Sequence, residues 1–215
     1  MELIEEILSY LHPHDMQSLR SCSLVAKSWL DPCRRHLFES VDISISGGRR
    51  WLNNISPKNT GLLRHVRELE YVTWHPPRPI GYGLRDYFPS FCQLQHLALQ
   101  FMTTEPTTPD HMKLFFAFQH TLVSLSLRHI LIPWGGIVTL LEYFPNLRDL
   151  EIRQVTFRME FPPVLNPICA LRGRLSVQYH TLNPESLIDQ FVGLKLEYEE
   201  LVITGTNEQR LIAAA

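Results

Sequence analysis

The sequence has few of the features that mark exported, membrane-spanning or zinc-binding proteins. Its 215 residues include only four cysteines, at positions 22, 33, 92 and 169, and no two of them form a Cys-x-x-Cys pair. Structural zinc sites need such close ligand pairs, and sparse cysteine is typical of a reducing compartment. No run approaches the roughly 18 apolar residues that span a bilayer. The acidic start "MELIEEILSYL" is unlike a secretory signal, so we expect a cytoplasmic or nuclear protein, or one present in both.

Strong charge and catalytic motifs are also missing. The formal net charge of -2 gives no bulk attraction to nucleic acid or to an anionic membrane, and we expect neither as a partner. There is no G-x-S-x-G, no phosphate-binding loop and no H-E-x-x-H, although a nucleophile needs a positioned base and an orienting group. Asp110 and His111 are adjacent, which is weak evidence for a catalytic pair. The sequence therefore predicts a protein that is not an enzyme, with no cofactor and no metal; catalysis is the competing hypothesis.

What the sequence does contain is a repeat, first visible in "LQHLALQFM", Leu94 to Met102. Within it, Leu97 and Leu99 are two apolar residues separated by one residue. Pairs of this kind, here called anchor pairs, recur along the chain. The anchor pairs are Val41 and Ile43, Leu69 and Tyr71, Leu97 and Leu99, Leu125 and Leu127, Leu150 and Ile152, Leu175 and Val177, and Leu201 and Ile203. Successive pairs are 28 residues apart (41 to 69, 69 to 97, 97 to 125), then 25 (125 to 150, 150 to 175) and 26 (175 to 201). The copy "LRGRLSV" carries one extra residue.

The spacing inside and between the anchor pairs predicts parallel strands. Residues two apart on a strand face the same side, so each pair is expected to be buried, with mostly polar residues between them facing water. About 15 to 20 residues separate the strands, which is enough for the crossover that parallel strands require. "PDHMKLFFAFQHTL", "GGIVTLLEYF" and "PESLIDQFVGL" have the apolar spacing of helices. An ordinary α/β sheet with similar connections is the alternative.

A unit of this length with the pattern L-x-x-L-x-L and a helical return resembles the leucine-rich repeat. That resemblance implies an irregular solenoid over residues 41–215, with about six to seven units, each stable only when stacked on its neighbours. The family places Asn or Cys three residues after the last anchor. The corresponding residues here are Trp74, Met102, Ile130, Val155, His180 and Thr206. We therefore expect degenerate units, and no obvious capping unit after the last strand.

Residues 1–40 have the apolar periodicity of helices instead. "MELIEEILSYL" places Leu3, Ile7, Leu8 and Leu11 on one helical stripe. Pro13 interrupts the pattern, and Asp15 is expected to cap a second helix, "MQSLRSCSLVAKSWL". A third helix, "DPCRRHLF", is expected to begin at Asp31 as cap with Pro32 in its first turn. Three helices in about 40 residues are too few for an independent core, so another surface must cover part of them.

This segment resembles an F-box, the helical motif that docks on the Skp-type adaptor of cullin-based ubiquitin ligases. The matching features are the Glu2-Leu3 start, the first helix, the Pro13-His14-Asp15 turn, Ser23-Leu24-Val25 with Ser28-Trp29, and the closing Arg34 to Phe38. The family's Leu-Pro before the first helix is missing here. An F-box followed by leucine-rich repeats is similar to many fungal proteins.

Together the two resemblances imply a non-catalytic substrate adaptor in ubiquitin-dependent degradation. Its partners would be the Skp-type adaptor, through it a cullin, and an unknown target protein. The residues expected to bind the adaptor are Leu3, Ile4, Ile7, Leu8, Leu11, Met16 and Leu19. The residues expected to bind the target, on the polar strand face, are Gln100, Arg128, Glu151, Arg153 and Gln178. The alternative is a leucine-rich-repeat scaffold that binds a protein partner independently of any ligase.

Overall fold

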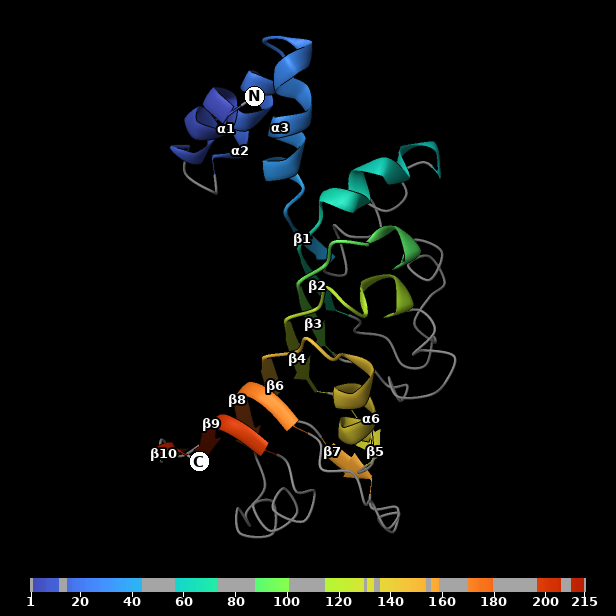
Figure 1. The fold of residues 1–215 in the computed structure, drawn as a ribbon, viewed down its shortest axis with the longest axis vertical. Helices are drawn as coiled ribbons and strands as arrows, with labels where there is room; N and C mark the ends of the chain where they lie inside the picture. Colours follow the sequence, from blue (N-terminus) through green and yellow to red (C-terminus); the bar gives the residue numbers. More distant parts are fainter. Residues whose placement is uncertain are drawn as a thin grey trace.

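The protein is an α/β molecule with a mostly parallel sheet and a group of helices at its N-terminal end, seen in a computed structural model (Figure 1). The described residues are 2–11, 15–43, 57–72, 88–100, 115–129, 131–133, 136–153, 156–158, 170–179, 197–205 and 210–214.

The N-terminal helices are α1 (Glu2–Ser9), α2 (Met16–Ser23) and α3 (Lys27–Leu37), called here the helical unit. The predicted cap of α2 is confirmed: the Asp15 carboxylate accepts a hydrogen bond from the Ser18 backbone N–H at 3.0 Å. The predicted helix start at Asp31 is wrong, because α3 begins at Lys27 and continues through Pro32. Proline removes one backbone hydrogen bond, whose acceptor would be the carbonyl of Ser28. Ser28 is exposed, so water can satisfy that carbonyl.

The helical unit has a small core of its own. Leu8 of α1, Leu19 of α2 and Cys33 of α3 are buried against one another. Partly buried apolar side chains pack around these three: Ile4, Leu11, Cys22, Trp29 and Leu37. Burial raises the pKa of the Cys33 thiol, and the neighbouring Cys22 and Glu5 add to the shift, so Cys33 stays protonated inside this core.

The sheet contains eight strands, stacked down the molecule in the order β1-β2-β3-β4-β6-β8-β9-β10 (Figure 1). Their bounds are β1 Ser40–Ile43, β2 Glu68–Val72, β3 His96–Gln100, β4 Ser124–Arg128, β6 Asp149–Arg153, β8 Ala170–Tyr179, β9 Glu197–Gly205 and β10 Arg210–Ala214. Strands β1 to β9 in this sheet pair in parallel, as the repeat predicts. The edge strand β10 is antiparallel to β9, and the sequence analysis did not anticipate it.

The anchor pairs lie opposite one another across all seven parallel strands. Val41 faces Leu69, which faces Leu97, and this row continues through Leu125, Leu150 and Leu175 to Leu201. The second row runs in the same way from Ile43 to Ile203. Wherever the burial of an anchor side chain is described it is buried, except for Tyr71, which is partly buried. The predicted repeat therefore sets the strand register.

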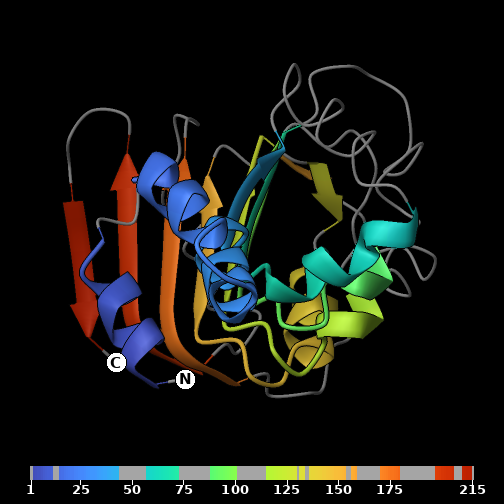
Figure 2. The ribbon, with the colours of Figure 1, turned by 90° about the horizontal axis from the view of Figure 1, so that it is seen from above.

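The described helices that connect the strands lie on one side of the sheet, as the views in Figures 1 and 2 agree. They include three 3-10 helices, η1 (Pro57–His65), η2 (Phe88–Ser90) and η3 (Phe115–Phe118), and the helix α6 (Gly136–Tyr143). A helix in "GGIVTLLEYF" is thus confirmed, whereas the described part of "PDHMKLFFAFQHTL" is a 3-10 turn. "PESLIDQFVGL" lies outside the described residues, as do the six positions where the family has Asn or Cys.

Phenylalanines fill the space between the sheet and its connections. Five phenylalanine side chains are fully buried there: Phe88, Phe91, Phe115, Phe118 and Phe144. Phe88 and Phe115 meet edge to face with ring centres 5.7 Å apart, and Phe118 stacks on Phe144 at 6.3 Å. Phe91, Phe118 and Phe144 stand three or four residues before the first leucine of an L-x-x-L-x-L segment, and Phe88 and Phe115 stand six or seven residues before it, so the stack follows the repeat. It joins successive units into one core.

Two irregularities follow from the repeat lengths. The extra residue in "LRGRLSV" is accommodated by a shift in the β8–β9 register between Leu171 and Arg174. Within this shift, Gly173 has a φ of 156°. A Cβ at Gly173 would lie 2.2 Å from the Arg148 carbonyl oxygen, so only glycine fits there. After β4 and β6 the short strands β5 (Leu131–Pro133) and β7 (Thr156–Arg158) pair in parallel, as expected for neighbouring copies of one unit.

Candidate binding surfaces

Large exposed apolar side chains gather on the helical unit. Among the described residues, six of the seven lie there, and Phe116 is the seventh. We call these six the apolar patch: Leu3, Ile7, Tyr10, Met16, Leu24 and Val25. The exposed fraction reaches 86% at Leu24 and 67% at Leu3. Isolated exposed apolar residues are normal, so six large ones in one small unit are an unusual concentration.

The sequence of α1 explains much of this patch. Ile4 and Leu8 are four residues apart and turn toward α2 and α3, where Leu8 is buried. Leu3 and Ile7 are also four residues apart and form a second apolar stripe beside the first. A helix that packs on one side needs a single stripe, so α1 carries more apolar surface than its own unit covers.

The residues expected to bind the adaptor fall into three groups. Leu3, Ile7 and Met16 are exposed and belong to the apolar patch. Leu8 and Leu19 are 1% and 2% exposed and form the core of the helical unit, so their side chains mainly hold its helices together. Ile4 and Leu11 are partly buried and pack against that core.

Sequence reasoning did not select Tyr10, Leu24 and Val25 as adaptor contacts. Tyr10 follows the end of α1 in a turn, where its backbone N–H donates to the Ile7 carbonyl at 3.3 Å. Leu24 and Val25 lie between α2 and α3 in a stretch predicted as continuous helix. Two adjacent apolar residues between helices have no helical face on which to be buried, and the break between α2 and α3 was not predicted from the sequence.

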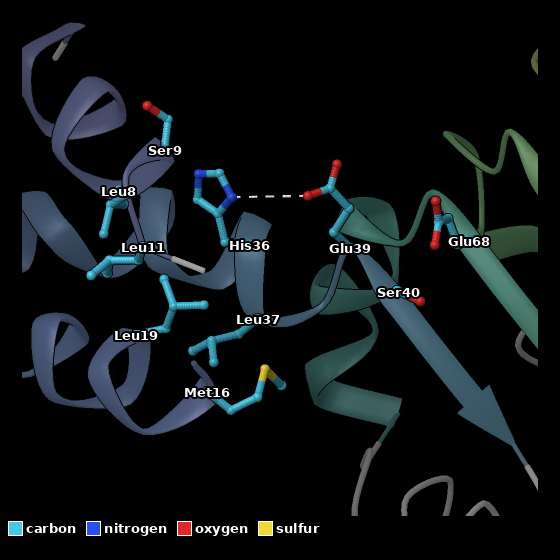
Figure 3. A pocket seen from close by; sticks show the side chains of 10 residues that line it. All are labelled: Leu8, Ser9, Leu11, Met16, Leu19, His36, Leu37, Glu39, Ser40 and Glu68. Carbon is cyan, nitrogen blue, oxygen red and sulfur yellow. Dashed lines mark ion pairs between the residues drawn. The ribbon is translucent and has the colours of Figure 1, made fainter. Parts of the chain in front are cut away.

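A cleft of about 620 Å³ separates the helical unit from the first strands. In Figure 3, Leu8, Leu11, Met16, Leu19 and Leu37 line its helical side, and Glu39, Ser40 and Glu68 line its strand side. His36 lies between the two sides, with its Nδ1 3.9 Å from a Glu39 carboxylate oxygen. The cleft is therefore apolar on one side and acidic on the other.

Ion pairs connect the helical unit to the sheet. Asp31 of α3 lies 3.5 Å from the Arg64 guanidinium and 3.6 Å from His65 Nε2, both in η1. Glu39 lies 3.5 Å from Arg67, whose backbone N–H also donates to the Glu39 carbonyl at 2.8 Å. His65 is only 9% exposed. Burial lowers the pKa of His65 and outweighs the opposing effect of Asp31, so this imidazole is neutral near pH 7.

The face of the sheet opposite the connections carries polar rows set by the same register. One row runs from Glu70 through Ala98, Ser126 and Glu151 to Ser176. The next row contains Gln100, Arg128, Arg153 and Gln178, so the strand register places the five expected target-binding residues in two neighbouring rows. Gln100, Arg128 and Glu151 are partly buried and Arg153 is exposed.

The charged members of these rows bind one another. The Ser126 hydroxyl donates to Glu151 Oε2 at 2.6 Å, and Arg153 donates to Glu151 Oε1. Arg128 reaches Glu151 at 3.4 Å on one side and Glu70 at 3.5 Å on the other, across β3, where the row has the small Ala98. Burial alone raises the pKa of Glu151, but these hydrogen bonds and the two arginines outweigh it and hold the pKa below its usual value.

A shallow hollow of about 310 Å³ lies on the same face over β1 to β4. Its lining includes Ser40, Glu68, Glu70, His96, Ala98, Ser124 and Ser126, together with Leu69 and Leu97. Ser40 and Glu68 also line the cleft, so the two depressions meet at these residues. Sequence reasoning did not single out Glu68 or Glu70 as binding residues.

Two searches of the described residues bear on the other site classes. No group of three metal-ligating side chains lies close enough together to hold an ion in the described part of the chain. No described helix has the length and apolarity needed to cross a membrane. Comparison of the chain with protein-family models, with curated proteins and with solved structures finds no match.

Proposed function

We propose that the chain is the substrate-recognition adaptor of a Skp-cullin-F-box ubiquitin ligase. Residues 1–40 would act as an F-box that docks on the Skp-type adaptor, and residues 41–215 as an irregular leucine-rich-repeat solenoid that holds a target protein. The ubiquitin-transfer chemistry would take place on partner subunits. This chain would contribute proximity, which makes an encounter between two molecules nearly unimolecular.

The observation that carries the proposal is the apolar patch. The helical unit encloses a core of only three fully buried apolar side chains, yet it exposes six large ones. At about 25 cal/mol per Å², covering such side chains would contribute several kcal/mol to an association. A partner that packs apolar residues against α1 and the α2–α3 connection would use that surface.

The repeat region supports the second half of the proposal. Its register places polar side chains from five neighbouring strands on one open sheet face, while the connections cover the other face. Extended open faces of this kind are the binding surfaces of stacked-repeat proteins. The closeness of the L-x-x-L-x-L pattern to the leucine-rich repeat favours this assignment over an ordinary α/β sheet.

The test is capture of purified Skp-type adaptor by the purified chain. The double variant Leu3→Asp plus Ile7→Asp places two charges in the patch without touching Leu8, Leu19 or Cys33. We expect it to weaken capture about tenfold or more, because exposed apolar anchors near the centre of an interface contribute most of its energy.

Phe116→Asp is the matched control, since it makes the same kind of change at the exposed apolar residue outside the helical unit. It should leave adaptor capture unchanged. Undiminished capture by the double variant would refute the docking surface. A folded wild-type chain that captures no adaptor would favour the repeat scaffold that acts without a ligase.

A further inference from the structure

On the open sheet face, acidic side chains without an ion pair among the described residues lie on β1 and β2. Arg128 and Arg153 are both held by Glu151, Arg128 also contacts Glu70, and Arg174 lies 3.8 Å from Asp149. These arginines are therefore largely neutralised. Glu68 and Asp42, in contrast, have no cation within ion-pair distance among the described residues.

The register brings these acids together. Asp42 of β1 lies opposite Glu70 of β2, and Ser40 lies opposite Glu68. Like charges on neighbouring strands repel one another. Among the described residues, Arg128 is the cation near Glu70, and it lies 3.5 Å from one carboxylate oxygen, Oε1. Arg67, beside the start of β2, lies 3.5 Å from Glu39 instead. The acidic end of this face would be stabilised by a positive charge that the described residues do not supply.

The shape beside Glu68 suits a narrow polypeptide segment. Its described lining includes four small side chains, Ser40, Ala98, Ser124 and Ser126, and contains no lysine or arginine. Four strands are about 14 Å across, a distance that a few extended residues can span. Glu68, Glu70 and His96, which line the hollow, do not form a cluster that could hold a metal ion.

We propose that the hollow over β1 to β4 binds an extended, positively charged segment of the target protein, with a lysine or arginine side chain placed against Glu68. This inference rests on the proposed function, because it names the chemistry of the segment that the repeat region holds. It also moves the centre of target binding away from Arg128 and Arg153 toward Glu68 and Glu70. Arg128 then has a supporting role, since it fixes the position of Glu70.

The probe is a fluorescently labelled peptide of about nine residues with alternating arginine and serine, long enough to cross the hollow when extended. Its counterpart has glutamate in place of arginine. We expect the chain to bind the basic peptide, to bind it more weakly as the salt concentration rises, and not to bind the acidic one. Fluorescence anisotropy with the full purified chain measures each affinity.

Two variants locate the site. Glu68→Lys should weaken binding of the basic peptide about tenfold, because it replaces the attracting charge by a repelling one. Ala98→Leu should also weaken binding, without a change of charge, because its larger side chain fills the hollow. Glu142→Lys on α6 has the same change of charge at an exposed residue on the other side of the sheet and should have no effect.

Equal weakening by Glu68→Lys and Glu142→Lys would mean attraction to overall charge only and would overturn the inference. So would equal binding of the acidic peptide, or a Glu68→Lys chain that binds like wild type. The assay contains no adaptor, so it is independent of adaptor capture. Loss of the peptide site with intact capture removes this inference alone, and failed capture with a specific peptide site removes only the ligase proposal.

Discussion

The helical unit and the sheet region treat apolar surface in opposite ways. In the sheet region, anchor rows and five phenylalanines form a core that continues from strand to strand, and Phe116 is the one large apolar side chain exposed among its described residues. In the helical unit, three buried residues form the core and six large apolar side chains remain exposed. Among the described residues, the sheet region covers nearly all of its large apolar side chains, whereas the helical unit leaves more of them exposed than it buries.

The difference originates in how each segment repeats. Each strand unit from β2 to β9 in the eight-stranded sheet has strand neighbours on both sides, and the edge strand β1 has one, so every anchor pair lies beside another copy of the same pattern. The helices have no repeating neighbour, and α1 carries two apolar stripes where its unit can cover one. Stability should therefore depend mainly on the sheet region, and adaptor binding on the helical unit.

The largest effect should come from breaking the phenylalanine stack. Phe118→Ala removes a fully buried ring that contacts Phe88, Phe115 and Phe144. We expect a loss of about 4 kcal/mol in the free energy of unfolding, because the cavity lies between successive units and cannot close. Urea unfolding followed by circular dichroism measures it. A loss below about 1 kcal/mol would show that the stack does not hold the units together.

A smaller and more local effect should follow from Leu8→Ala. Leu8 is one of the three buried core residues of the helical unit, so we expect a local loss of about 3 kcal/mol there. Hydrogen exchange should become faster in α1, α2 and α3, while β3, β4 and β6 keep their protection. Equal acceleration in those strands would contradict the separation between the two regions.

The smallest effect should be a pH dependence at the contact between the regions. Burial lowers the pKa of His65 below its ordinary value of 6.5, against the attraction of Asp31 and with the repulsion of Arg64, Arg35 and Arg34. A histidine with a lowered folded-state pKa binds protons more readily when unfolded, so stability is full above pH 6.5 and falls as the pH drops below it.

His65→Gln should remove that part of the pH dependence. Thermal unfolding at a series of pH values between about 5 and 8 measures it for both chains, across the range in which histidine titrates. His96→Gln is the control, since His96 is exposed on the sheet face. A wild-type chain that grows more stable as the pH falls through this range would reverse the expected sign.

The sequence predicted the sheet better than it predicted the surfaces. Residues two apart must face the same way, and a constant period sets the register, so the anchor rows could be read directly. The phenylalanine stack was missed because Phe88 and Phe115 stand in 3-10 turns, whose spacing differs from the helical one. Pro32 suggested a helix start, yet its position in mid-helix is tolerated where the freed carbonyl is exposed.

The binding residues were harder to predict because burial depends on partners within the chain. Leu3 and Leu8 look alike in the sequence, but only the packing of α2 and α3 decides that Leu8 is covered and Leu3 is not. In the same way, Arg128 and Arg153 looked free until their contacts with Glu151 were visible. Glu68 became a candidate only when the structure showed that Glu70 and Glu151 form ion pairs with arginines and that Glu68 has none among the described residues.

Hydrogen exchange of the whole chain, with and without purified Skp-type adaptor, tests the central claim most directly. We predict that the adaptor slows exchange in α1, in α2 and at residues 24–26 between α2 and α3, and leaves β3, β4 and β6 unchanged. Unaltered exchange in α1 at saturating adaptor, or protection confined to the sheet, would contradict the account.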